Sequence, residues 1–281
     1  MINFNRKIGL LIADAGGEAL DLSGFRVIFE VAKTGTETPN TAKIDIYNLA
    51  PTTAQKILSG EMKRIVLQAG YESNFGVLFD GGIMASTMAR NGTDTILSIE
   101  AGDGDEAYSY AVVTQAISSG YKQSDIAGTA VSTLKEKGTR TEDAESIDKE
   151  TVYPRGRTLF GSTRSYAREL AKTSDCQWSI QDGQVIFCKV KKTPKGRVAF
   201  VLKPTTGLIG SPTVDKDGLK AVCCLNPQLS IYDPLVVESE FVKGTYKIVS
   251  VTHKGDNFGT TWTTEVDASV MDTSQSETTQ R

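Results

Sequence analysis

The chain has 281 residues, of which 39% are hydrophobic, and a net charge of −3 from 31 Lys and Arg against 34 Asp and Glu. This length allows one large domain or two to three small ones, and the near balance of charge argues against a nucleic-acid binder, which needs clustered basic side chains for phosphate contacts. A single histidine, His253, leaves almost no material for a histidine metal site or for histidine acid–base catalysis, so the composition weighs against a hydrolase.

The first hundred residues are predicted to form strands joined by tight turns. Residues 25–31 and 42–47 alternate apolar with polar side chains and are expected to be neighbouring strands. A short helix is expected after Pro51, where Ala54, Ile57 and Leu58 recur at helical spacing before Gly60 stops it. Asn91-Gly92 is predicted to be a hairpin turn, because this dipeptide tolerates positive φ at both central positions. Further strands are expected over residues 65–69, 77–79, 83–90 and 93–100.

The middle of the chain changes to a helical period. Ser124 is expected to cap a helix that ends near Gly138, and Ser162 is expected to cap a second helix. The polar segment 139–149 between them is predicted to be an exposed loop. A hairpin over residues 176–187 follows the second helix, so this segment is predicted to be a small α+β unit. The buried side chains expected on the two helices are Ile126, Ala130, Leu134, Tyr166 and Leu170.

Beyond a polar connector at residues 191–196 the chain returns to short strands, which we expect over 235–237, 246–251 and 261–266. After Met271 the chain has no apolar side chain, so this tail is expected to be mobile and to add nothing to a core. The sequence therefore predicts a mainly β protein, α+β overall. The expected divisions are a first β domain over 1–105, an α+β insert over 106–190, a second β domain over 191–270 and a flexible tail over 271–281.

The placement of the four cysteines indicates the cellular compartment in which the protein is made. Cys176 and Cys188 flank a predicted two-residue turn at Asp182-Gly183, which places their thiols on opposite faces of the hairpin. Cys223 and Cys224 are adjacent, where a disulfide would be strained. The first residues lack the pattern of an export signal. The sequence thus predicts four reduced cysteines in a protein made in the cytosol. The expected cross-strand pairs are Gln177 with Cys188 and Cys176 with Lys189.

One acidic segment, Gly102-Asp103-Gly104-Asp105-Glu106, has the oxygen ligands that calcium prefers. Its spacing does not fit an EF-hand, because the third ligand position would be Ala107 and no glycine follows where the loop must turn. As a general acid and base, these carboxylates show no sign of the burial that would separate their pKa values. We therefore interpret the segment as a tight glycine turn that leads out of the first β domain.

Two further patterns match catalytic motifs by chance. Ser132 and Lys135 fit the S-x-x-K pattern of serine acyl enzymes, but Lys33-Thr34-Gly35, which fits their K-T-G element, lies upstream instead of near the end. No serine or cysteine carries a nucleophile signature that could pair with His253. We expect His253 to have a structural role, with its ring bonded to a turn carbonyl or to Asp256.

Three stretches, in their order and spacing, carry a resemblance over nearly the whole chain. They are Phe25-Arg26-Val27-Ile28-Phe29-Glu30-Val31 through Leu49, with Ala69-Gly70-Tyr71 and Phe79-Asp80-Gly81; Gly102-Asp103-Gly104-Asp105 with the Ser124 helix and the helix-hairpin around Trp178; and Gly207-Leu208-Ile209-Gly210-Ser211-Pro212, Cys224-Leu225-Asn226-Pro227, Gly244-Thr245-Tyr246 and His253-Lys254-Gly255-Asp256 before Trp262. The chain resembles the baseplate hub proteins of tailed bacteriophages, a group that includes the hub part of type VI secretion spikes.

This resemblance implies two tail-tube-like β-barrel domains that pack side by side, so that a homotrimer presents six barrels in a ring. Such a ring would join the sixfold tail tube to the threefold central spike of a virion, assembled in the host cytoplasm and used for host cell entry. The implied partners are the tail tube protein, the spike, and the tape measure and baseplate wedge proteins. The chain ends shortly after the second barrel, so the spike is expected to be a separate chain. The resemblance implies no catalytic, cofactor or metal residue.

Two other functions remain open from the sequence. One is a peptidoglycan-degrading tail enzyme with Asp103, Asp105 or Glu106 as its acid. The other is a hexameric tail tube or distal tail protein, which would usually have one barrel per chain. The sequence favours a non-enzymatic protein without sequence-specific nucleic-acid binding, and no segment approaches the ~18 apolar residues of a membrane span.

Overall fold

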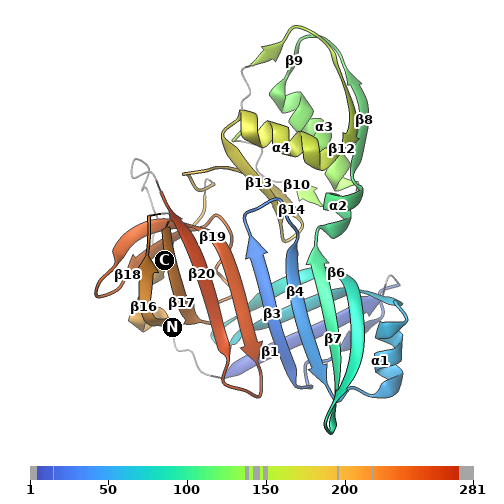
Figure 1. Ribbon diagram of the computed structural model, residues 1–281, viewed down its shortest axis with the longest axis vertical. Coiled ribbons are helices and arrows are strands. Elements are labelled where there is room, and N and C mark those ends of the chain that lie inside the picture. The colour runs from blue at the N-terminus through green and yellow to red at the C-terminus, as the bar shows by residue number, and fades with distance from the viewer. Residues whose placement is uncertain are drawn as a thin grey trace.

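The computed structural model describes residues 5–14, 16–136, 139–141, 146–147, 151–194, 196–216 and 218–271. In this part of the chain, one large β-sheet carries a smaller unit of helices and short strands, which stands above the sheet in Figure 1. The fold is mainly β, as the sequence predicts.

The elements of the first part are β1 (Arg6–Asp14), β2 (Ala19–Asp21), β3 (Val27–Thr34), β4 (Asn40–Tyr47), α1 (Pro51–Leu58), β5 (Met62–Tyr71), β6 (Asn74–Asn91) and β7 (Asp94–Asp103). The middle elements are α2 (Asp105–Tyr110), β8 (Val112–Ile117), β9 (Tyr121–Lys122), α3 (Gln123–Lys135), β10 (Arg140–Thr141), β11 (Val152–Tyr153), β12 (Arg157–Ser162), α4 (Thr163–Thr173), β13 (Cys176–Gln181) and β14 (Gln184–Lys189). The last elements are β15 (Phe200–Leu202), the 3-10 turn η1 (Pro204–Thr206), β16 (Leu208–Val214), β17 (Gly218–Cys224), β18 (Pro234–Glu238), β19 (Lys243–Asp256) and β20 (Trp262–Val270).

The local predictions for the first part are confirmed at β3, β4 and α1. β3 and β4 pair antiparallel, and the apolar members of their alternating pattern are buried. Helix α1 begins at Pro51, whose fixed φ suits the first helical position, and buries Ala54 and Ile57. The helix ends at Leu58, before the left-handed Gly60.

The β6–β7 hairpin forms, but two details of its prediction are wrong. Residues 77–79 and 83–90 belong to one strand, β6, which continues through a bulge between Ile83 and Ala85. Asn91 pairs with Asp94, so the turn is Gly92-Thr93 instead of Asn91-Gly92. Gly92 has a φ of 61°, which fits the first central position of a type II′ turn, where glycine is preferred.

Both predicted helices of the middle unit are present, and the cap residue of one of them differs from the prediction. Helix α3 begins one residue before Ser124, and the Asp125 carboxylate accepts the N–H of Lys122 at 2.8 Å. Helix α4 follows Ser162 as predicted, although the Ser162 hydroxyl makes no capping bond. The predicted stripe residues Ile126, Ala130, Leu134 and Leu170 are buried, and Tyr166 packs at the edge of the same cluster.

The prediction of an exposed loop over 139–149 is wrong for the residues that the structure describes there. Thr139 and Ile147 are buried, and β10 pairs parallel to β14. Ile147 packs into the apolar cluster of the middle unit, which a polar sequence context does not reveal.

The β13–β14 hairpin has the predicted turn and the predicted register. Cys176 lies opposite Lys189, and Cys188 lies opposite Gln177. Cys176 therefore packs into the cluster of the middle unit, whereas Cys188 packs into the cluster below the second part of the sheet. The two faces of this hairpin serve two cores.

The two predicted β domains share one continuous sheet of 13 strands in the described part of the chain. Its strand order is β16-β17-β20-β19-β3-β4-β7-β6-β5-β1-β2, and off this path β18 pairs with β19 and β15 pairs with β18. The link is β19, which pairs antiparallel with β3 (Figure 1). The expectation of two barrels is corrected, because the pairings of the described residues close neither half into a barrel.

The buried apolar residues form three clusters. The first lies among the strands from β1 to β7 and α1, and it also takes in Leu225 and Trp262 from the last part of the chain. The second fills the middle unit around Trp178. The third lies under β17 to β20 and takes in Ile186 of β14. Strand β20 therefore contributes to the first and third clusters, and strand β14 to the second and third.

No helix among the described residues has the length and apolar character needed to cross a membrane. Apart from Met271, the tail predicted to be mobile lies outside the described residues.

Candidate functional site

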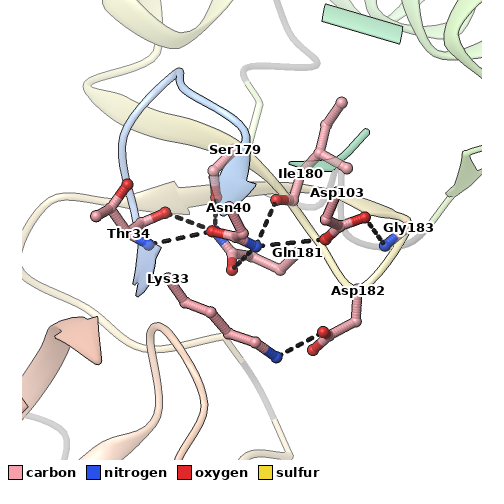
Figure 2. Close-up of polar contacts among 9 residues, drawn as sticks. All are labelled: Lys33, Thr34, Asn40, Asp103, Ser179, Ile180, Gln181, Asp182 and Gly183. Atoms are coloured by element: carbon pink, nitrogen blue, oxygen red, sulfur yellow. Dashed lines mark hydrogen bonds and ion pairs between the residues drawn. The ribbon is translucent and has the colours of Figure 1, made fainter. Parts of the chain in front are cut away.

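A cluster of polar side chains joins the turn of the β13–β14 hairpin to the ends of β3, β4 and β7 (Figure 2). Asn40, the first residue of β4, donates from Nδ2 to Oε1 of Gln181 at 3.0 Å and accepts the N–H of Thr34 at Oδ1. Gln181 in turn donates from Nε2 to the carbonyl oxygen of Thr34 at 2.7 Å. We call this cluster the hairpin joint. Its members are Lys33, Thr34, Asn40, Asp103, Gln181, Asp182 and Gly183.

Asp103 is the buried carboxylate of the hairpin joint. It is the last residue of β7 and is 4% exposed. Its Oδ1 accepts the N–H of Gly183 at 3.2 Å, and its Oδ2 accepts Nδ2 of Asn40 at 3.3 Å. Burial, and then the nearby Asp182 carboxylate, raise the pKa of Asp103 to about 6, against the opposing effect of Lys33 and the hydrogen bonds. Asp103 therefore changes its charge near pH 6.

A buried lysine lies beside this carboxylate. Nζ of Lys33 contacts Oδ1 of Asp182 at 2.6 Å, and the Asp182 side chain is half-exposed at the hairpin turn. Lys33 was not predicted as a residue of this site, although the alternating pattern of β3 contains a signal for it. In β3, Val27, Phe29 and Val31 are the buried members of the alternating pattern, and Lys33 is next on the same face.

A groove of about 1370 Å³ opens beside the hairpin joint. Asp103, Asp182 and Tyr110 are among its lining residues. The Arg64–Asp80 ion pair, with a distance of 2.6 Å, lies on its wall. The apolar lining includes Leu58, Met62, Val77, Ile83 and Met84.

Among the side chains that the structure describes, Asp103 is the only one of the three acidic candidates. Asp105 and Glu106 begin α2, and their side chains lie outside the described ones. Gly104 precedes them with a φ of 73°, which confirms the predicted glycine turn out of β7. Among the described residues, no group of three His, Cys, Asp or Glu side chains could hold a metal ion.

His253 is a buried structural residue, but its predicted partner is wrong. Its Nδ1 lies 2.9 Å from the hydroxyl of Thr264 on the neighbouring strand, and that hydroxyl also accepts the N–H of Asn226. Asp256, the predicted partner, instead binds Arg26 at 2.8 Å. Burial, helped by the positive charge of Lys33, lowers the pKa of His253 to about 3.

The residues of the serine acyl-enzyme pattern serve separate structural roles. Ser132 lies on α3 and donates its hydroxyl hydrogen to the carbonyl of Thr129 at 2.8 Å. Lys33 belongs to the large sheet and is engaged by Asp182, as described above. Neither contact positions a nucleophile, so the structure supports the interpretation of these patterns as chance matches.

Comparison with known protein families identifies the family to which this chain belongs. The model of the family described as "Baseplate hub gp41" matches residues 7–266. The chain belongs to the baseplate hub gp41 family. The resemblance seen in the sequence is thereby confirmed, and the family is one of structural tail proteins.

Solved structures share the fold of this hub protein at low sequence identity. The 43 kDa tail protein of prophage MuSo2 from Shewanella oneidensis has a TM-score of 0.63 at 11% identity, with 95% of this chain and 98% of that chain covered. The tail protein from Neisseria meningitidis MC58 has a TM-score of 0.65 at 10% identity, with coverage of 95% and 97%. An Escherichia coli component of the type VI secretion system, described as similar to the T4 tail proteins gp27 and gp5, has a TM-score of 0.54 at 10% identity, with coverage of 89% and 74%. A search of curated proteins finds no match.

In a structural hub, the hairpin joint holds two parts of the chain together. Both oxygens of Asp103 accept hydrogen bonds from Asn40 and Gly183, which lie on elements far apart in sequence. Together with the Lys33–Asp182 pair, these bonds fix the middle unit to the large sheet. The geometry therefore favours a positioning role for these polar residues.

Proposed function

We propose that this hub protein forms a homotrimeric ring that joins a sixfold tail tube to a threefold central spike in the baseplate of a phage tail. Each chain contributes two tube-like β units, residues 1–105 and 191–270, with the α+β unit of residues 106–190 inserted between them. Three chains then supply six similar units. Such a ring matches the sixfold tube on one side and remains threefold on the other.

The pairing of β3 with β19 carries this proposal. It joins a strand of the first β unit to a strand of the second, in a register that runs from Ile28 opposite Asp256 to Thr34 opposite Ser250. Trp262 of β20 strengthens the link, because it packs edge-on against Phe29 with ring centroids 5.6 Å apart. Two units fixed side by side in one chain are what an alternating ring requires.

The ends of the sheet support contacts between chains. The edge strands of the sheet are β2, β16 and β15, and a strand at such an edge has backbone groups that another chain can pair or cover. Near the β16 end, Ile209, Val214 and Val222 are exposed apolar side chains. Head-to-tail contacts in a ring would cover these groups.

The proposed partners follow from this place in the particle. The ring contacts the tail tube protein on one side and a spike protein on the other, and tape measure and baseplate wedge proteins lie next to it. The family places the protein in the tail baseplate of the virion. We propose that it is assembled there in the host cytoplasm and takes part in host cell entry.

Electron microscopy of assembled tails tests the proposal. We expect three copies per particle, with both β units of every chain in one ring. Six copies would favour a hexameric tube or distal tail protein, and β units stacked along the tail axis would also contradict the proposed ring.

A wall-degrading activity is the alternative from the enzyme class. Asp103 shares a raised pKa with catalytic acids, but it is almost fully buried and its oxygens face Asn40 and Gly183. We expect the protein to leave the turbidity of a cell-wall suspension unchanged. A loss of turbidity that Asp103→Asn abolishes would establish the enzyme instead.

A further inference from the structure

Two carboxylates from different elements meet in the hairpin joint. Asp103 comes from the end of β7, and Asp182 comes from the hairpin turn. Lys33 binds Asp182 at 2.6 Å, whereas Asp103 receives neutral donors, the N–H of Gly183 and the amide of Asn40. An ionised Asp103 is therefore a buried negative charge beside a second one, while Lys33 is already engaged by Asp182.

Titratable groups of the hairpin turn, β3 and α2 surround Asp103. Asp182 on the hairpin opposes its ionisation, and Lys33 on β3 favours it. Tyr108 on α2 is buried with a raised pKa, so it is neutral at physiological pH, and its hydroxyl accepts the N–H of Ile180. The side chains of Asp105 and Glu106, which follow Asp103 in sequence, and of Arg140, which pairs with Gln184 of β14, lie outside the described ones.

We propose that the hairpin joint is a proton-operated latch, in which proton uptake by Asp103 tightens the hairpin turn against the ends of β4 and β7. Protonation removes the repulsion between Asp103 and Asp182 and the cost of a buried charge. The protonated carboxyl keeps one oxygen that accepts the N–H of Gly183. The amide of Asn40 also donates to the carbonyl of Ile180 and to Oε1 of Gln181, so it keeps acceptors when Asp103 takes up the proton. Loss of the proton loosens the turn.

The difference between the pKa of Asp103 in the closed joint and in the open joint sets the sign and the size of the pH effect on closure. When the turn opens, water reaches Asp103 and its pKa returns toward the ordinary 3.8, whereas in the closed joint it is about 6. The closed joint binds the proton more tightly, so acidification favours closure and a rise in pH favours opening. From pH 5 to 7.5 the equilibrium constant for opening is expected to rise about tenfold.

Amide hydrogen exchange at Gly183 tests the latch, because this N–H is the donor to Asp103. In the full chain, after correction for the intrinsic exchange rate, we expect its protection factor to fall about tenfold from pH 5 to 7.5. Asp103→Asn keeps the shape and hydrogen-bonding capacity without the charge, so its protection factor should be independent of pH. Asp80→Asn, at the surface ion pair with Arg64, is the matched control and should behave as the unchanged protein does.

Three outcomes would overturn the latch. They are a pH-independent protection factor in the unchanged protein, retained pH dependence in Asp103→Asn, and loss of the dependence in Asp80→Asn. Should Asp103→Asn fail to fold, the carboxyl carbon of Asp103 can be titrated by NMR in the unchanged protein. A midpoint near 6 supports the latch, and a midpoint near the ordinary 3.8 excludes it.

Discussion

At the scale of single residues, Trp178 shows how one large buried side chain contributes to a core. Trp178 of β13 is 1% exposed and lies between Tyr108 and Phe187, with ring centroids 5.4 and 6.3 Å away. Aromatic residues at such positions supply much of the apolar area of a small core.

Trp178→Ala should lower the free energy of unfolding by ~3–5 kcal/mol, because it leaves a cavity in the cluster of the middle unit. Urea denaturation followed by circular dichroism measures the change. Phe160→Ala is the matched control, since Phe160 lies on β12 and is 75% exposed, and it should change stability by no more than ~0.5 kcal/mol. Equal effects of the two variants would contradict the burial of Trp178.

His253 makes a second prediction at this scale. Its pKa falls from an ordinary 6.5 to about 3 in the fold, so the folded state holds the neutral ring. The stability that this provides is present above pH 6.5 and is lost as pH falls toward 3, because the unfolded chain binds the proton more readily. Since the chain has one histidine, the NMR signal of its imidazole is unambiguous. It should not shift between pH 7.5 and 5 in the folded protein, and a midpoint near 6.5 would contradict the prediction.

At the scale of elements, tight turns and helix starts follow local chemistry. Gly92 has a positive φ of 61° at the tip of the β6–β7 hairpin, and no atom beyond its two chain neighbours lies within 4 Å of the place where a Cβ would be. The requirement for glycine is therefore conformational and not steric. The same local logic explains why α1 begins at Pro51.

Gly92→Ala should destabilise the protein by ~1 kcal/mol, because alanine disfavours positive φ. Gly82→Ala in the same strand is the control. Its φ is not in the left-handed region, and the nearest atom to its added Cβ is the Lys63 carbonyl oxygen at 3.8 Å. Thermal or urea unfolding of both variants measures the difference. A Gly82→Ala variant that is as destabilised as Gly92→Ala would contradict the conformational explanation.

At the scale of the whole molecule, the β3–β19 pairing makes the two halves of the sheet depend on each other. Trp262 lies on β20 but belongs to the cluster of the first half, where Phe29 and Arg6 contact its ring. Neither half can therefore unfold without exposing apolar surface of the other. Cooperative behaviour is the expected consequence.

The two halves of the large sheet should therefore unfold in a single transition. In a Trp178→Phe variant, Trp262 is the remaining tryptophan and its fluorescence reports on the contact between the halves. We expect its urea transition to coincide with the loss of far-ultraviolet circular dichroism from the sheet. A separate, earlier transition of Trp262 would show that the β3–β19 link opens independently.

The sequence by itself determined the local elements and the class of protein. Period-two alternation located β3 and β4, helical spacing located α1, and a two-residue turn set the β13–β14 register correctly. The order of such segments was also sufficient for the resemblance to baseplate hubs, which the family match confirms. These features depend on neighbours in the chain, so local chemistry decides them.

Only the tertiary structure decided which distant segments meet. The pairing of Val31 with His253 joins strands more than two hundred residues apart, and it merges two expected barrels into one sheet. Asp103 is buried because the turn at Gly183 covers it, and His253 binds Thr264 because β20 lies beside β19. Periodicity shows which face of a strand is apolar, but it does not show which strand lies next to it. That choice depends on packing among all three clusters at once.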